Sequence, residues 1–168
     1  DYNAQAADGR AGVVALVPRG GQSSNPQGRA RGQKDDPGGN GHPANTSGGT
    51  YSWWPNRPGE VVLNYQPITR GRFRIWLSWG SGPLSHVGDA HYLLDTDGDL
   101  QTRGDQVLLA TVNQRNFSDG EVPTEQPPLW SGTYNAGIHE IDVLSTILLR
   151  GASKGAAITS DVVILEPV

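Results

Sequence analysis

The chain has 168 residues, a formal net charge of −4 and no cysteine, so we expect one domain with a hydrophobic core and exclude a disulfide scaffold or a thiolate metal site. Its 13 basic residues are scattered, which argues against nucleic-acid binding, and no run of 18 apolar residues indicates a membrane span, so we expect a soluble form. Glycine (23 residues) and proline (12 residues) are frequent, which predicts long loops around an economical core.

The N-terminal part of the chain contains a single candidate strand. Residues 1–11 are polar and without a period, so we expect a tail or a segment that a partner orders. Residues 12–17 (GVVALV) are apolar and β-branched, which is typical of a strand. Residues 18–49 have almost no apolar side chains and are too long for an ordinary connection. We predict one domain over 12–168, with a Gly/Pro-rich loop at 18–49 that is flexible or is held by an ion, a ligand or a neighbouring subunit.

From residue 50 onward the pattern is that of a β protein. In residues 72–79 (RFRIWLSW), Phe73, Ile75, Leu77 and Trp79 alternate with the polar side, and we expect the apolar set to point inward. Turn-forming residues separate the segments, and no stretch has a helical period. The fold class is therefore predicted as all-β, an antiparallel β-sandwich or jelly roll. The other predicted strands cover 60–65, 90–94, 107–113, 130–134, 138–143, 146–150 and 157–165.

An acidic segment, DTDGDLQTRGDQ (95–106), follows the strand at 90–94. Carboxylates this crowded repel one another unless a hard cation neutralises them, and Ca²⁺ takes about six to eight oxygen ligands. The position of Gly98 and the lack of flanking helices exclude an EF-hand. We predict a looser Ca²⁺ loop, with a solvated Asp/Gly hairpin as the alternative. The predicted ligands are Asp95, Asp97, Asp99, Gln101 and Asp105.

Five tryptophans are many for this length, and some could face outward. Trp53 and Trp54 are adjacent, so in an extended chain they face opposite ways. Trp76 lies on the polar side of its strand, beside Arg74. An outward tryptophan offers a flat apolar face on which a sugar ring can stack, and a neighbouring arginine adds hydrogen bonds. We predict a ligand site from these four residues; the alternative is that the 18–49 loop covers Trp76 as a second core layer. Trp79 and Trp130 are assigned to the core.

Catalytic and metal-binding motifs other than the acidic segment are absent from the sequence. The pairs Ser131-Gly132 and Ser160-Asp161 lack the strand–turn–helix context of a nucleophile elbow. The acidic residues gather in one turn, whereas a glycosidase needs two carboxylates on opposite sides of a bond. We therefore do not expect an enzyme. The four histidines, His42, His86, His91 and His139, have no zinc-ligand spacing and are expected to be structural.

The order of five segments resembles the golvesin C-terminal-like domain, a family that includes the carbohydrate-binding domain type of xanthan lyase. Ala90-His91-Tyr92 matches its A-x-Y strand, Val112-Asn113-Gln114 stands at its V-D-Q strand, and residues 130–134 are close to its tryptophan motif. The resemblance implies a galactose-binding-like β-sandwich appended to secreted bacterial proteins. It assigns no ligand residues. The segments are 71–82 (GRFRIWLSWGSG), 86–99 (HVGDAHYLLDTDGD), 108–117 (LLATVNQRNF), 128–143 (PLWSGTYNAGIHEIDV) and 156–168 (AAITSDVVILEPV).

We thus expect a secreted, non-catalytic module at a bacterial cell surface that binds a polysaccharide or a cell-surface glycan and is stabilised by Ca²⁺. The alternative is a structural or assembly subunit of an extracellular layer or filament. In that case the N-terminal 49 residues would contact neighbouring subunits or a larger parent protein, because exposed sheet edges accept added strands.

Overall fold

A computed structural model describes residues 5–6, 14–23, 51–80, 85–115 and 134–168. Every element in these ranges is a strand, so none of the described residues forms a helix that could cross a membrane. The strands are β1 (Gln5–Ala6), β2 (Val14–Leu16), β3 (Gln22–Ser23), β4 (Ser52–Pro55), β5 (Val61–Tyr65), β6 (Gly71–Leu77), β7 (Ala90–Asp95), β8 (Val107–Val112), β9 (Tyr134–Ile141), β10 (Thr146–Arg150), β11 (Ala157–Ser160) and β12 (Val163–Pro167).

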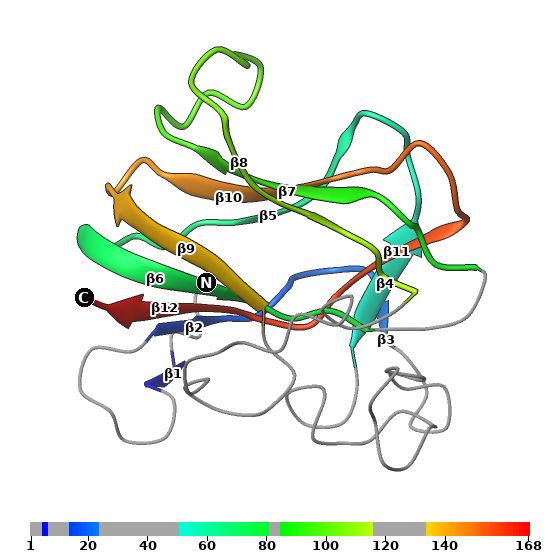
Figure 1. Ribbon diagram of the computed structural model, residues 1–168, viewed down its shortest axis with the longest axis horizontal. Helices are drawn as coiled ribbons and strands as arrows, with labels where there is room; N and C mark the ends of the chain where they lie inside the picture. The colour runs from blue at the N-terminus through cyan, green and yellow to red at the C-terminus, as the bar shows by residue number, and fades with distance from the viewer. Residues whose placement is uncertain (1–4, 7–13, 24–50, 81–84, 116–133) are drawn as a thin grey trace.

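The strands form two facing sheets and a smaller third sheet across one end (Figure 1). One facing sheet has the order β1-β2-β12-β6-β9 and the other has the order β5-β10-β7-β8. The third sheet has the order β11-β4-β3. All paired strands are antiparallel. The predicted class, an all-β antiparallel sandwich, is confirmed.

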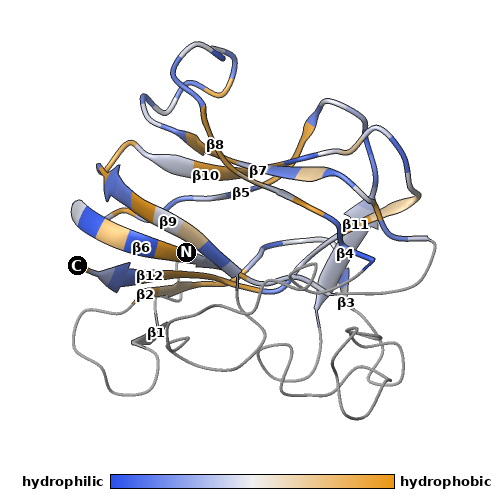
Figure 2. Ribbon diagram, in the orientation of Figure 1, coloured by the Kyte–Doolittle hydropathy of each residue, from blue (hydrophilic) through white to orange (hydrophobic). Residues whose placement is uncertain are grey.

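The main core lies between the two facing sheets and is built by alternation along the strands. On β6, Phe73, Ile75 and Leu77 are buried in this core, as predicted, and Trp79 follows them just after the strand. Figure 2 shows the alternation of hydrophobic and hydrophilic residues along β6. From the facing sheet, Ile147 and other apolar residues of β10 and β7 meet them. Burying each of these side chains contributes roughly 1.5–3 kcal/mol relative to exposure.

Trp76 does not face water, and this part of the predicted ligand site is wrong. Its exposed fraction is 0%, and it forms a second apolar cluster with Val162, Ile164 and Ala15 on the other side of the sheet. Trp76, Ile164 and Ala15 lie side by side because β6, β12 and β2 pair in that register. The indole N–H donates to Glu166 Oε2 at 3.0 Å, which satisfies the one polar group of the ring. The period was right, and Trp76 belongs to a second apolar layer, as in the alternative prediction. Residues 24–49, part of the loop that this alternative assigned as its cover, lie outside the described residues.

Some strand boundaries differ from the predicted ones. The predicted strand at 157–165 is two strands, β11 and β12, which belong to different sheets and are separated by Asp161 and Val162. Strand β9 continues through residues 134–141, where a break was expected. Two short strands, β1 and β3, occur within the predicted tail and the predicted 18–49 loop. Residues 1–4, 7–11, 24–49 and 130–133, which include Trp130, lie outside the described residues.

Candidate cation loop and adjacent cleft

Residues 95–106, here called the Asp loop, connect β7 to β8 and project from one end of the sandwich (Figure 1). Asp95 is the last residue of β7 and is fully buried. Its carboxylate accepts hydrogen bonds from the Gly98 backbone N–H and from Gln106 Nε2, each at 3.0 Å. The Gln106 side-chain carbonyl in turn accepts a hydrogen bond from Arg150 on β10. The root of the loop is therefore anchored to two strands of the sheet.

Asp105 closes the loop from its other end. Its Oδ2 accepts hydrogen bonds from the backbone N–H groups of Thr96 (3.0 Å) and Asp97 (3.1 Å), and from the Thr96 hydroxyl (3.1 Å). The hydrogen bond from the Thr96 backbone, followed by those from Asp97 and the Thr96 hydroxyl, lowers the pKa of Asp105 below its usual value. Asp105 therefore stays anionic at neutral pH, which is the form that binds a cation.

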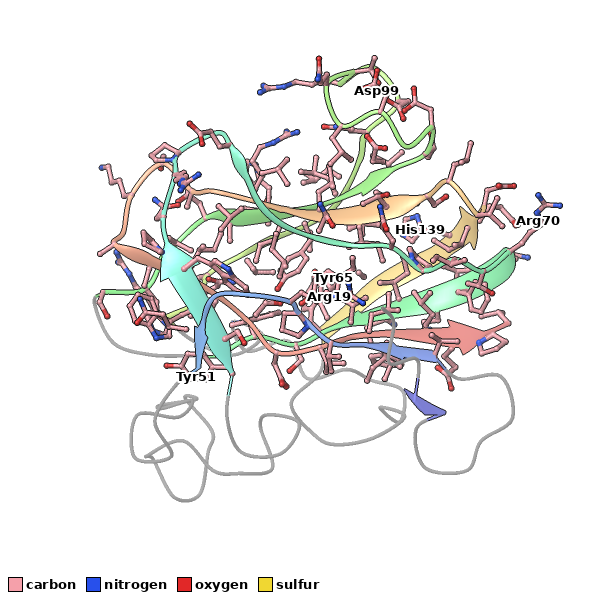
Figure 3. The ribbon with its side chains drawn as sticks, turned by 180° about the vertical axis from the view of Figure 1, so that it is seen from behind. Arg19, Tyr51, Tyr65, Arg70, Asp99 and His139 are labelled. Atoms are coloured by element: carbon pink, nitrogen blue, oxygen red, sulfur yellow. The ribbon has the colours of Figure 1, made fainter. Side chains whose placement is uncertain are left out.

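Three of the four predicted carboxylate ligands of Ca²⁺ come together, and Gln101 stays a prediction. Carboxylate oxygens of Asp95, Asp97 and Asp105 all lie within 4.8 Å of one another. Asp99 is outside this group: it lies at the tip of the loop (Figure 3), and its Oδ1 accepts the Gln101 backbone N–H at 3.0 Å. Thr102 holds the tip, because its hydroxyl donates to the Asp99 carbonyl at 2.8 Å. The three clustered oxygens match the hard oxygen donors that Ca²⁺ prefers.

An open cleft of about 260 Å³ adjoins the Asp loop. We call it the Ile68 cleft, and three chain segments form it: the connection from β5 to β6, the turn from β9 to β10, and the Asp loop at Gly98. All three lie at the same end of the sandwich, where Arg70 and Asp99 are seen in Figure 3. Its lining residues are Gln66, Ile68, Gly98, Val143, Leu144, Ser145 and Thr146.

The aliphatic residues of this cleft are in unusual positions. Ile68 has a φ of 45°, a left-handed conformation that costs a β-branched residue roughly 1–3 kcal/mol, and yet 60% of it is exposed. Val143 and Leu144 are the two central residues of the turn that the Ser145 N–H closes onto the Asp142 carbonyl at 3.0 Å. Such positions usually hold glycine, asparagine or aspartate, and Leu144 is also 60% exposed. A contribution to local stability does not explain why Ile68, Val143 and Leu144 occupy these positions.

The other predicted ligand residues are not gathered on one surface. Trp53 and Trp54 lie half-buried on β4, in the small third sheet. Trp54 packs against the main core and on the backbone of Gly21, where a Cβ would come within 2.4 Å of the indole ring. Arg74 is half-buried on β6, and in the strand register it lies opposite Glu166 of β12. A sugar-binding role for Trp53, Trp54 and Arg74 stays a prediction.

The Ser160-Asp161 pair lies inside the sandwich as part of a hydrogen-bonded network. The Ser160 hydroxyl bonds to Tyr65 OH, which lies between the sheets (Figure 3), and lies 3.5 Å from Tyr92 OH. Asp161 accepts a hydrogen bond from the Ser78 hydroxyl at 2.9 Å. Burial raises the pKa of Tyr65 and of Tyr92, so both phenols remain protonated. These hydrogen bonds satisfy polar groups where the chain passes from β11 in the third sheet to β12 in the five-stranded sheet.

We expect the buried His86 to lower the free energy of unfolding in mild acid. It is buried with its ring edge-on to Tyr51, and burial lowers its pKa below the usual 6.5. Below about pH 6.5 the unfolded chain binds a proton that the folded chain does not, until the pH reaches the lower folded pKa. The free energy of unfolding therefore falls in this window, by at most about 1.4 kcal/mol per pH unit. Urea unfolding at several pH values should show this slope in the protein and in His91→Gln, but not in His86→Gln; equal slopes in both variants would contradict it.

Several residues of the site had no clear signal in the sequence. The hydrogen bonds within the Asp loop depend on Thr96, Thr102 and Gln106, whose side chains reach carboxylates or carbonyls several residues away. The Ile68 cleft was missed entirely. One signal existed: Leu144 stands between the predicted strands at 138–143 and 146–150, where a polar turn residue is the usual choice. The meeting of that turn with Ile68 and Gly98 depends on three separate segments and has no local signature.

No protein-family model matches the sequence, and no curated protein matches it. Among solved structures, the chain is similar to a xanthan lyase from Paenibacillus, with a TM-score of 0.51 and 17% sequence identity. The match covers 100% of this chain and 13% of the lyase chain, so this chain spans a small part of that protein's length. At this identity the likeness establishes the fold, which this chain shares with one part of a carbohydrate-active protein.

Proposed function

We propose that this chain is a non-catalytic extracellular module that binds a glycan, with a Ca²⁺ ion held by the Asp loop. The observation that carries the proposal is the group of carboxylate oxygens from Asp95, Asp97 and Asp105, within 4.8 Å of one another beside an open cleft. Three anionic groups at this separation repel one another, and a bound cation removes the repulsion. A loop ordered in this way forms one wall of the cleft through Gly98.

The glycan class rests on one structural comparison and one sequence prediction. The fold is shared with part of a xanthan lyase, and the sequence resembles the golvesin C-terminal-like domain in the order of its segments. A module of this kind would belong to a larger secreted bacterial protein and would place that protein on a polysaccharide. Because Trp76 is buried, the proposed contact region is the end of the sandwich that holds the Asp loop and the Ile68 cleft.

Retention on immobilised polysaccharides tests this proposal. Affinity electrophoresis with neutral and acidic bacterial polysaccharides should show retarded migration in Ca²⁺ and at least about tenfold weaker retention in chelator. Asp97→Asn should lose most of the retention, because it removes one of the three clustered carboxylates. Asp99→Asn is the matched control from the same loop, and it should behave like the unaltered protein.

A failure to bind any polysaccharide in either condition would contradict the proposal. The assembly alternative would then be favoured by one feature of the fold. Within the described residues β8 pairs only with β7, and 55% of Leu108 is exposed on this edge. An edge of this kind accepts an added strand. Light scattering on the same samples would show a mass that rises with concentration if assembly is the function.

A further inference from the structure

We propose that the Ile68 cleft binds one uncharged sugar residue that carries a methyl group, such as a 6-deoxy or acetylated sugar, and that its affinity depends on the cation in the Asp loop. This inference rests on the proposed glycan-binding function and specifies its ligand. Three arguments support it: the position of the aliphatic side chains, the size and charge of the cleft, and the contact between Gly98 and the turn at Leu144.

The aliphatic side chains of the cleft are retained against local preference. Ile68 is in a strained left-handed conformation with its side chain largely exposed, and Val143 and Leu144 occupy the centre of a tight turn. Strained backbone and exposed apolar residues both gather at binding sites, because the contact with a ligand compensates for them. Here these features come from different segments and meet at one cleft. That coincidence indicates an apolar ligand group at this position.

The size and lining of the cleft define the ligand group. A volume of about 260 Å³ is below the usual range of whole-ligand pockets and suits a single sugar residue. No aromatic ring is among the lining residues, so the cleft cannot stack a sugar ring face to face. Branched aliphatic side chains instead surround a methyl group well. The Gln66 amide and the hydroxyls of Ser145 and Thr146 also line the cleft. The Ser145 oxygen accepts the Asp142 backbone N–H at 2.9 Å, so this hydroxyl would act as a donor to an adjoining sugar oxygen.

The charges around the cleft oppose an anionic ligand. Gly98 is flanked in the chain by Asp97 and Asp99, and Asp142 begins the turn that carries Leu144. Arg70 Nε lies 3.3 Å from Asp142 Oδ2, so these two charges offset each other and the acidic residues of the Asp loop set the local charge. With Ca²⁺ bound, the three clustered carboxylates keep one net negative charge and Asp99 adds another, so a carboxylated sugar would still meet net negative potential here, whereas an uncharged sugar would not. The ligand is therefore neutral.

Gly98 links the cleft to the Asp loop. Its backbone N–H donates to Asp95 Oδ2 at 3.0 Å, and its α-carbon faces the Leu144 carbonyl so closely that an added Cβ would lie 3.1 Å from that oxygen. A cation bound by Asp95 fixes the position of Gly98, and Gly98 in turn forms the wall against Leu144. Ligand and cation each favour the same arrangement, so each should strengthen the binding of the other.

The experiment titrates the ¹⁵N-labelled protein with two sugars that differ only at one carbon, L-rhamnose and L-mannose, in Ca²⁺ and in chelator. We expect shifts at the Ile68 cleft residues, with L-rhamnose binding at least about threefold more tightly because one methyl group is buried. In chelator the affinity for L-rhamnose should fall at least about fivefold. The acetylated pair, N-acetylglucosamine and glucose, should show the same preference. Equal affinities within both pairs would overturn the methyl assignment.

Two pairs of variants separate binding from folding. Ile68→Asn should weaken L-rhamnose binding at least about tenfold without lowering the melting temperature, because asparagine tolerates the left-handed conformation. Leu108→Asn removes a similarly exposed aliphatic side chain on β8 and should leave binding unchanged. Gly98→Ala should lose binding, whereas Gly59→Ala, which has a similar φ (74° against 81°) but open space around it, should keep it.

The outcomes also distinguish this inference from the proposed function. If polysaccharide is retained in a Ca²⁺-dependent manner but Ile68→Asn is retained equally well, the cleft assignment is wrong and the glycan-binding function stands. If the unaltered protein binds neither sugars nor polysaccharides, both are wrong. If Gly98→Ala and Gly59→Ala lose binding equally, the proposed coupling through the Leu144 carbonyl is wrong.

Discussion

Replacing Trp76 with alanine is expected to lower the free energy of unfolding by about 3–5 kcal/mol, as is usual for a buried tryptophan. The ring is completely buried in a cluster with Val162, Ile164 and Ala15, and Ile164 lies opposite Trp76 on the next strand. Its removal leaves a cavity on the outer side of the five-stranded sheet and takes away the donor to Glu166. Urea unfolding followed by circular dichroism measures the change directly.

Two further variants define the reason for the effect of Trp76→Ala. Trp76→Phe keeps most of the apolar ring but removes the indole N–H, so it should cost less than Trp76→Ala. Its cost is that of a smaller cavity plus about 1 kcal/mol for the lost hydrogen bond to Glu166. Leu108→Ala, at an exposed position, should change stability by less than about 0.5 kcal/mol. If Trp76→Ala left stability unchanged and abolished glycan binding, Trp76 would be a surface platform and the second apolar cluster would not exist.

Calcium is expected to raise the thermal stability of the protein substantially. A cation that binds the folded loop and not the unfolded chain stabilises the fold by about 2.7 kcal/mol when its concentration is 100 times the dissociation constant. For a chain of this length that free energy corresponds to a rise of roughly 5–10 °C in the melting temperature. The physical source is the relief of repulsion among Asp95, Asp97 and Asp105. Differential scanning calorimetry in Ca²⁺ and in chelator measures it.

The same loop provides the controls for the calcium experiment. Asp97→Asn keeps an oxygen that can accept the Asp99 backbone N–H, now 2.7 Å from Asp97 Oδ1, but removes a charge from the clustered group. It should lose most of the Ca²⁺-dependent rise, and Asp99→Asn should keep it. Mg²⁺ should give a smaller rise, because it demands octahedral geometry and gives up its waters reluctantly. Identical melting temperatures with Ca²⁺ and chelator would mean that the loop is a solvated turn.

The Trp76 and calcium experiments test different parts of the molecule. Trp76 tests the packing of the sheet, and calcium tests the Asp loop, which projects from the end of the sandwich (Figure 1). The two sites are on different sheets, since Trp76 is on β6 and Asp95 ends β7. Their effects on stability should therefore add within about 0.5 kcal/mol. A strong coupling between Trp76→Ala and the calcium response would show that the loop and the outer cluster depend on a common element.

Sequence by itself predicted the features that depend on local pattern. A period of two in residues 72–79 was sufficient to assign Phe73, Ile75 and Leu77 to the core, because successive side chains on a strand point to opposite faces. The acidic segment was visible for a similar reason. Its carboxylates are close in the chain, so any turn brings some of them together, and Asp95, Asp97 and Asp105 do meet. The calcium ion itself remains a prediction.

Only the tertiary structure decided which side chains are covered and which separate segments meet. Trp76 belongs to a buried cluster in which β12 and β2, far away in the sequence, place Ile164 and Ala15 on the same face of the sheet. The Ile68 cleft exists because two turns and the Asp loop converge at one end of the sandwich. Alternation tells which face of a strand a residue occupies, whereas exposure depends on what the paired strands bring to that face. That pairing is set by contacts between distant residues, and no local pattern contains it.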